Sequence, residues 1–237
     1  NEGFAILICT MSLILLLPIL SKELNYKAGH EAQLYKNRLT FKELVLGIRQ
    51  SMFNPSAFAA IIFMLFANIG YGIFDVIYNE FYIKELGWNG EEIGHMRPYG
   101  MWLGGLIGLS AGLMTLYFRK RSLLLFFVIG QAVVFLTAST LSYETSILLT
   151  SAVLVGVDAV DAGWSVLIFS ILMALCTTQT SATNFGIFMG FGNISMLIGN
   201  NIAPAILGSG DFTFAFTFAA LTLIPCLISG YYLTKET

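Results

Sequence analysis

The amino-acid sequence predicts an all-α membrane protein, a polytopic helical bundle, and three observations support this fold class. Of the 237 residues, 57% are hydrophobic and only 11% are charged, whereas a soluble domain has about 25% charged residues. The apolar residues form long unbroken runs, without the polar–apolar alternation of strands in a membrane β-barrel. Several of these runs reach the roughly 20 residues that a helix needs to cross the hydrocarbon core of a bilayer.

Seven apolar segments are predicted to cross the membrane: 3–20, 57–82, 98–118, 122–141, 147–176, 185–207 and 212–233. The connections between them are short, except for residues 21–56. If this long connection lies in the cytoplasm, alternation of the loops places every Lys and Arg on that side except Lys84 and Arg97. Because cytoplasmic loops are rich in Lys and Arg, we expect a multi-pass protein of the cell or inner membrane whose linker and C-terminus are cytoplasmic.

The linker at 21–56 is expected to contain a short helix. The sequence Thr40-Phe-Lys-Glu43 fits a capping box, and apolar residues then recur at helical spacing. This pattern predicts an amphipathic helix at 40–52 that lies on the cytoplasmic membrane surface. Asn54-Pro55 then separates the linker from the six-helix domain predicted at 57–237.

Two carboxylates lie inside the run 147–176, which contains no other charged residue. At 1.5 Å per residue, Asp158 and Asp161 lie roughly 16–21 Å from its start, near the middle of the bilayer. A carboxylate at that depth is costly unless it faces a cavity or a partner, so it is by default a functional-site hypothesis. The two residues are three positions apart and therefore share one helix face.

Segment 57–82 carries a polar stripe that matches this pair. One helix face is predicted to hold Asn68, Tyr71, Asp75, Tyr78 and Tyr82, with Asn79 beside it. Asp75 lies about 12 Å from the outer end of its segment, and 147–176 starts from the same side. We therefore expect Asp75 and Asp158 at comparable depths. The alternative for each aspartate is an ion pair with an Arg or Lys from a preceding half of the protein.

Small and amide side chains mark two further segments. Gly104, Gly108 and Gly112 form a ladder of small residues in 98–118, which allows two helices to approach closely. Segment 185–207 repeats this theme with Gly186 and Gly190, and it adds the amides Asn193 and Asn200. A buried amide needs hydrogen-bond partners, which either a neighbouring helix or a ligand can supply.

The spacing Asp158-x-x-Asp161 does not indicate an enzyme. The Asp-x-x-Asp-Gly-x-x-Ala-Arg pattern of CDP-alcohol phosphotransferases is not met, because Ala162 stands at the first glycine position and the arginine is missing. The Gly-x-Gly-Asp motif of intramembrane aspartyl proteases is absent too. The two histidines, His30 and His95, fall in loops on opposite sides of the membrane. Without a Walker, Rossmann or zinc motif, we expect no catalysis, no metal, no bound cofactor and no nucleic-acid partner.

With spans and orientation in place, the chain resembles the C-terminal half of a major facilitator superfamily transporter, preceded by the sixth helix and the central linker. One helix at 3–20, which lacks the features of a signal peptide, precedes a basic linker and six further spans. The phrase Leu86-Gly-Trp-Asn-Gly-Glu-Glu-Ile-Gly94 is similar to the one that joins the seventh and eighth helices. Arg119-Lys120-Arg121 stands where the superfamily's gating motif has its basic cluster. The resemblance implies that the chain is the later part of a longer protein, with a six-helix half upstream.

Within this superfamily the run from Asp158 through Gly163 to Gly186 resembles AmpG-type permeases and their acetyl-CoA transporter relatives. This resemblance implies a secondary transporter that works by alternating access on an amino-sugar, muropeptide-like or other organic anion substrate. The carboxylates near the midplane predict that a proton gradient drives it. Each half of such a protein contains two inverted three-helix repeats, and the first helices of the repeats line the cavity. Here these are 57–82 and 147–176, the two spans with aspartates.

The implied mechanism makes Asp158 the coupling residue and Asp161 its neighbour, because desolvation favours the neutral form of a carboxyl group and so allows proton exchange. The substrate would contact Asp75, Tyr71, Asn79, Ser165, Asn193 and Asn200. Two alternatives remain open: a non-transporting, receptor-like membrane protein of the same fold, and a multidrug efflux pump.

Overall fold

A computed structural model of the chain describes residues 46–47, 49, 52–176, 181–208 and 211–236. These residues form helices and turns without a β-strand, and they belong almost entirely to one compact unit that begins at Gly47. The predicted span 3–20 and most of the linker lie outside the described residues. Of the predicted amphipathic helix at 40–52, Leu46, Gly47, Arg49 and Met52 are described, and they are helical.

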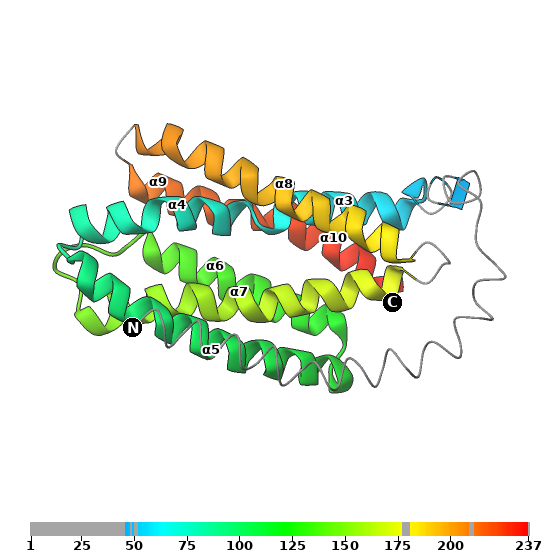
Figure 1. Cartoon of the computed structure of the whole chain (residues 1–237), viewed down its shortest axis with the longest axis horizontal. Coiled ribbons are helices and arrows are strands. Elements are labelled where there is room, and N and C mark those ends of the chain that lie inside the picture. The colour runs from blue at the N-terminus through cyan, green and yellow to red at the C-terminus, as the bar shows by residue number, and fades with distance from the viewer. Residues whose placement is uncertain (1–45, 48, 50–51, 177–180, 209–210, 237) are drawn as a thin grey trace, which may run out of the picture. The chain divides into compact units, whose positions relative to one another are not determined.

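Eight helices make up the described part (Figure 1): α3 (Pro55–Ala67), α4 (Ile69–Lys84), α5 (Gly90–Tyr117), α6 (Lys120–Ala138), α7 (Ile147–Leu175), α8 (Ser181–Leu207), α9 (Phe212–Leu221) and α10 (Leu223–Glu236). Five helical stretches are long and apolar enough to cross a membrane: α3 with α4, α5, α6, α7, and α9 with α10. Helix α8 has 27 residues with several glycines and asparagines, and it is not among these five.

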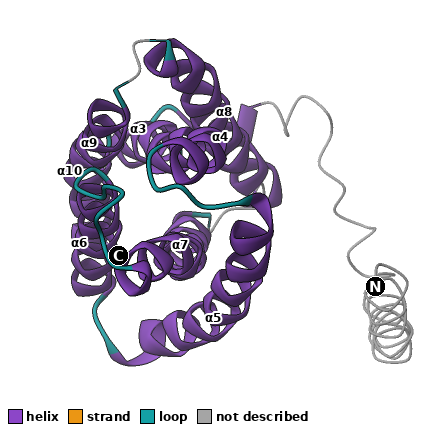
Figure 2. Cartoon of the chain, turned by 90° about the vertical axis from the view of Figure 1, so that its left-hand side faces the viewer, coloured by secondary structure: helices purple, strands orange, loops and turns teal. Residues whose placement is uncertain are grey.

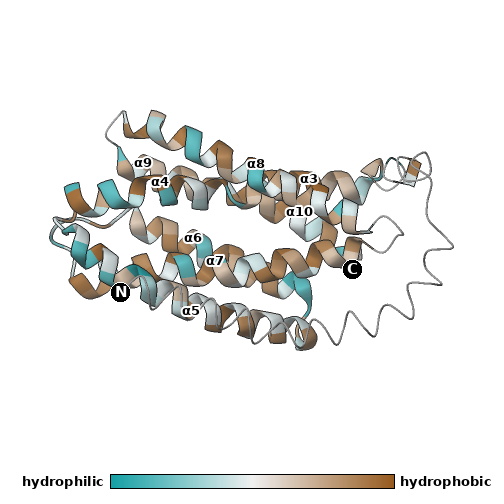
Figure 3. Cartoon of the chain, in the orientation of Figure 1, coloured by the Kyte–Doolittle hydropathy of each residue, from teal (hydrophilic) through white to brown (hydrophobic). Residues whose placement is uncertain are grey.

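Apolar residues predominate along most of the helices (Figure 3), and many of them are exposed. On α5 alone Trp102 is 79% exposed, and Leu106, Leu109, Leu113 and Leu116 are exposed along the same helix. Monomeric soluble proteins rarely expose an apolar surface of this extent. Together with the helix lengths, this surface indicates a multi-pass membrane protein.

The first described span begins where the sequence predicts. The Asn54 side chain caps α3 by accepting a hydrogen bond from the backbone N–H of Ala57 at 2.7 Å, and Pro55 occupies the first helical position. Both residue types are typical of helix N-termini.

The first span is broken at Asn68, whereas the sequence predicts a continuous helix over 57–82. The backbone N–H of Asn68 donates to Ser195 Oγ at 3.0 Å, and its side chain donates to the Gly192 carbonyl at 3.4 Å. On the other side of the break, Trp164 Nε1 donates to the Ala67 carbonyl at 3.2 Å. Side chains of α7 and α8 thus bond backbone groups at the break, as a helix interrupted inside a membrane requires.

The second described span begins at Gly90, eight residues before the predicted start at 98. Asn89 and Glu92 form a reciprocal capping box, with N–O distances of 2.8 and 2.9 Å. Gly87 turns the chain between α4 and α5 with a φ of 73°, a conformation that glycine adopts without strain. As a consequence, Arg97 belongs to the second turn of α5 and not to an outer loop.

The contacts between the helices follow a repeated pattern, in which α3–α4, α5, α6, α7, α8 and α9–α10 are counted here as the first to sixth spans (Figure 2). The first span, α3–α4, packs against α8 and against α9–α10. The fourth span, α7, packs in the same way against α5 and α6, while α6 packs against α9 and α10. Exchanging the first, second and third spans with the fourth, fifth and sixth therefore preserves these contacts.

Candidate functional site

Arg97 links the first and the fourth spans of the bundle. Its Nη2 donates to Asp75 Oδ1 on α4 at 2.6 Å, and its Nε lies 3.5 Å from Asp158 Oδ2 on α7. The exposed fractions of the side chains are 18% for Arg97, 34% for Asp75 and 8% for Asp158. The expectation that Asp75 and Asp158 lie at the same level is confirmed, because one guanidinium reaches both.

Two tyrosines of α4 complete this ion-pair network. The Tyr71 hydroxyl donates to Asp158 Oδ1 at 3.1 Å, and the Arg97 guanidinium lies 4.1 Å from the centre of the Tyr78 ring. A cation over an aromatic face is attracted by the ring quadrupole. The network therefore draws on α4, α5 and α7, and its cation comes from this chain itself.

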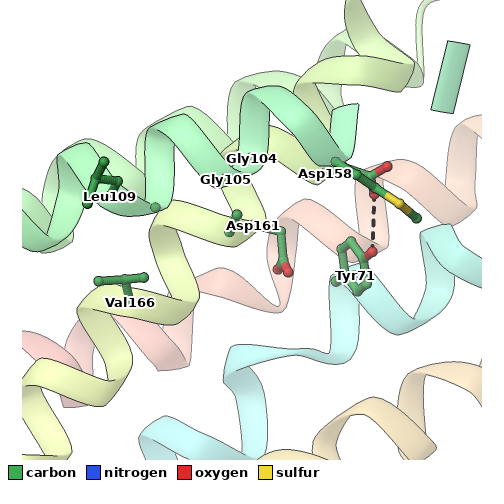
Figure 4. A pocket seen from close by; sticks show the side chains of 10 residues that line it. Tyr71, Gly104, Gly105, Leu109, Asp158, Asp161 and Val166 are labelled. Atoms are coloured by element: carbon green, nitrogen blue, oxygen red, sulfur yellow. Dashed lines mark hydrogen bonds between the residues drawn. The ribbon is translucent and has the colours of Figure 1, made fainter. Parts of the chain in front are cut away.

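A cavity of about 510 Å³ adjoins the network. It is lined by Tyr71 of α4, by Met101, Gly104, Gly105, Gly108 and Leu109 of α5, and by Asp158, Asp161, Ala162 and Val166 of α7. Figure 4 shows Asp161 and Tyr71 projecting from two helices toward the same space. Among the described residues the Asp161 carboxylate has no hydrogen-bond or ion-pair partner. Asp158 is thus held in place, whereas Asp161 is free to meet a ligand.

The glycines of α5 bring this helix against α7. A Cβ at Gly104 would lie 3.1 Å from the Ala162 Cβ, and one at Gly100 would lie 3.0 Å from Asp158 Oδ2. The contacts are looser further along, where Gly108 and Gly112 approach Val166 at 3.5 and 3.7 Å. The predicted small-residue ladder is therefore an α5–α7 contact that borders the cavity, and its tightest position includes Gly100, which the sequence analysis did not single out.

Glycines of α8 also make a close contact, but not at the predicted positions. Gly186 and Gly190 have no neighbouring atom within 4 Å of a Cβ among the described residues. Gly199 instead meets Gly72 of α4, and a Cβ on Gly199 would overlap the Ile69 carbonyl. The small-residue pattern correctly marked α8 as a helix that packs closely. Within the described residues, however, the close contact is made by Gly199 and not by Gly186 or Gly190.

The predicted polar contacts divide into those inside the bundle and those outside it. The Asn200 amide of α8 faces α4, and in the orientation that its surroundings favour, its nitrogen donates to the Gly72 carbonyl at 3.0 Å. Asn79 and Asn193 are exposed, and Ser165 is half-buried but does not line the cavity. These three do not join Asp161 in the described bundle.

The basic cluster 119–121 lies between α5 and α6 and makes contacts with two later helices. Lys120 donates to the Ser170 carbonyl of α7 at 3.3 Å, and the Arg121 guanidinium lies 3.3 Å from the centre of the Tyr231 ring on α10. Arg119 is the N-cap residue of α6. The cluster thus connects the start of α6 to the ends of α7 and α10.

Arg97 is the main residue that the sequence analysis missed, because the apolar run begins one residue after it. A signal was present: Arg97 stands three, seven and eleven positions before Gly100, Gly104 and Gly108. This spacing places it on the glycine face of α5. The pattern Asn89-x-x-Glu92 likewise marks a helix start well before the apolar run.

No protein-family model matches the chain, and comparison with curated proteins gave no significant match. What the fold and the site define is a class: a multi-pass helical membrane protein with an ion-pair network beside an acidic cavity.

Proposed function

We propose that the protein is a secondary active transporter that moves a small solute by alternating access, and that this chain supplies a six-helix half of the major facilitator type. The observation that carries the proposal is the Arg97 bridge between Asp75 and Asp158, which lies beside a cavity at the junction of the first and fourth spans. Charged side chains inside a membrane bundle mark substrate or ion pathways.

The packing pattern supports the same proposal. The contacts of α3–α4 with α8 and with α9–α10 correspond to those of α7 with α5 and with α6. Both corresponding contacts also use glycine: α4 meets α8 at Gly72 and Gly199, and α7 meets α5 at Gly104. Two three-helix repeats related by a pseudo-two-fold axis would produce this arrangement, with a binding site at the junction of the repeats.

The proposed coupling step is proton exchange at Asp158. This carboxylate already shares a guanidinium with Asp75 and accepts a hydrogen bond from Tyr71. When Asp158 takes up a proton it loses its attraction for Arg97, which then pairs with Asp75 alone. Proton binding on α7 is thereby transmitted to α5 and α4. In this scheme 119–121 gates the opposite end, and the linker and C-terminus are cytoplasmic.

The test is solute-coupled proton flux in proteoliposomes that contain the full-length protein and a trapped pH-sensitive dye. The panel consists of amino sugars, short peptides, amines and organic acids. We expect at least one solute to drive proton movement in the wild-type protein, and we expect Asp158→Asn to reduce this flux to the level of empty liposomes. Asp211→Asn is the matched control: Asp211 caps α9, and asparagine also caps helices well.

Normal coupled flux in the Asp158→Asn protein, at equal reconstitution, would remove Asp158 from the coupling step. Saturable binding of a solute without any flux would select a receptor-like protein over a transporter. Efflux of structurally unrelated solutes would indicate a multidrug pump.

A further inference from the structure

The cavity beside the ion-pair network has an unbalanced charge. Asp75, Asp158 and Asp161 are three carboxylates, and Arg97 is the one cation that contacts any of them in the described residues. The other described Lys and Arg residues lie before α3 or at helix ends: Arg49, Lys84, Arg119, Lys120, Arg121 and Lys235. One guanidinium cannot neutralise three carboxylates, so the site retains negative charge when all three are ionised.

The negative charge is concentrated where a ligand would bind. The ten residues that line the cavity include two carboxylates and no Lys, Arg or His. Arg97 does not line it, because its guanidinium is directed to Asp75 and Asp158 at the edge. An anionic substrate in this cavity would therefore be repelled by Asp161, and no cation among the lining residues would pair with it.

Two independent features mark the cavity as a ligand site and not merely an acidic cluster. First, the Asp158 side chain is only 8% exposed, and its Oδ2 has the 3.5 Å ion pair with Arg97 Nε but accepts no hydrogen bond within the described residues. This oxygen therefore keeps the capacity to accept a hydrogen bond from a bound group. Second, the Asp161 carboxylate faces a space of about 510 Å³, far more than a water molecule needs.

The remaining lining selects the kind of cation. Met101, Leu109 and Val166 are apolar, and Gly104, Gly105 and Gly108 present bare backbone. A hard metal cation needs several oxygen ligands that converge on one point, and no such group of His, Cys, Asp or Glu side chains exists among the described residues. An organic ammonium, in contrast, needs one carboxylate for its charge, an acceptor such as the Tyr71 oxygen, and an apolar wall for its body.

We infer that the cavity binds a solute with a protonated amine on an apolar body, and that the ammonium group pairs with Asp161 beside the Tyr71 hydroxyl. This inference rests on the proposed transport function and names its substrate class. It differs from the organic anion that the family resemblance implies, since the charges that line this cavity are of the wrong sign for an anion. Asp158 and Arg97 then serve the coupling step, and Asp161 serves the substrate.

The experiment uses three probes of one shape and different charge: phenethylammonium, phenethyl alcohol and hydrocinnamate. Their binding to the purified full-length protein in lipid nanodiscs is measured by calorimetry at neutral pH, with empty nanodiscs as the blank for partition into lipid. We expect phenethylammonium to bind roughly tenfold or more tightly than the alcohol, as a charge-assisted hydrogen bond would give, and hydrocinnamate to bind most weakly.

Asp161→Asn should remove the preference for the ammonium probe and leave binding of the alcohol within about twofold, since the amide keeps the size of the side chain and loses only its charge. Glu80→Gln is the matched control, because Glu80 is an acidic residue of α4 that pairs with Lys84 away from the cavity. This variant should keep the wild-type preference.

Three results would overturn the inference: tightest binding of hydrocinnamate, an ammonium preference that persists in Asp161→Asn, or no binding of phenethylammonium to folded wild-type protein. Its failure is distinct from failure of the proposed transport. Ammonium binding without flux would retain the site and reject the transporter, whereas proton-coupled flux of organic acids alone would retain the transporter and reject the ammonium site.

Discussion

Replacing Arg97 by glutamine should destabilise the bundle by an amount that the surroundings of its two carboxylates determine. The change removes the only cation that contacts Asp75 and Asp158 in the described residues. Asp158 is then left with the Tyr71 hydroxyl as its hydrogen-bond donor. Tyr78 also loses the guanidinium that lies over its ring.

The two carboxylates contribute unequally to the cost. Removing one partner of a buried ion pair typically costs about 3–5 kcal/mol, and with 8% exposure Asp158 is close to that case. Asp75 is 34% exposed, so solvent screens its charge and its share is small. The retained Tyr71 bond offsets about 1 kcal/mol. We therefore expect Arg97→Gln to lower the free energy of unfolding by about 2–4 kcal/mol.

The assay is equilibrium unfolding of the purified protein in mixed micelles with increasing dodecyl sulfate, followed by tryptophan fluorescence. Asp158→Asn in the Arg97→Gln background should recover most of the loss, because it removes the charge that has no partner. Lys84→Gln serves as the control, since its exposed pair with Glu80 should contribute less than about 1 kcal/mol. An Arg97→Gln protein as stable as the Lys84→Gln protein, or no recovery in the double variant, would refute the buried network.

Two further predictions concern helix packing and are measured by the same unfolding assay. Gly199→Ala should lower the free energy of unfolding by about 1–3 kcal/mol or more, because the new methyl group overlaps the Ile69 carbonyl, which is backbone and cannot move aside alone. The control Gly186→Ala has no neighbouring atom within 4 Å among the described residues, so it should be neutral or stabilise by up to about 1 kcal/mol. Equal effects at the two sites would contradict the α4–α8 contact. Trp164→Phe should cost about 1–3 kcal/mol, since the Ala67 carbonyl at the helix break loses its indole donor; an unchanged midpoint would show that this bond does not stabilise the break.

Much of the helical arrangement could be predicted from the sequence because the bilayer restricts what an apolar run can form. The runs that became α6 and α7 match their predicted segments within a few residues. The prediction failed at two places where polar residues, and not hydropathy, determine where a helix begins. The apolar run at 98 starts after the capping box at Asn89, so hydropathy alone places the start of this helix too late. Hydropathy also does not detect the break at Asn68, which depends on an acceptor from α8, Ser195 Oγ, and on a donor from α7, Trp164 Nε1.

The candidate site was predictable in part for the same reason. Asp75 and Asp158 were found because charge inside an apolar run is costly, and Tyr71 was found because it shares a helix face with Asp75. The structure brings the three together around Arg97. Their partner was not found, because which cation reaches a carboxylate depends on how α5 packs. Asn79 and Asn193 illustrate the opposite error. Polarity placed them in the site, whereas in the structure both are exposed and neither lines the cavity.

The position of Arg97 also constrains how the proposed transport cycle would proceed. Its guanidinium belongs to α5, whereas its carboxylates belong to α4 and α7, so a shift of α5 changes both pairings at once. At its closest points the α5–α7 contact at Gly100 and Gly104 contains the Asp158 side chain, the Ala162 Cβ and backbone atoms, without a large apolar side chain. Such a surface opposes sliding less than interlocked large side chains do. The Arg97 guanidinium lies closer to the first span than to the fourth, since its nitrogens are 2.6 Å from Asp75 and 3.5 Å from Asp158. Loss of the charge on Asp158 would leave the Arg97 guanidinium paired with Asp75 alone. For this reason we assign proton exchange to Asp158 and substrate binding to the unpaired Asp161.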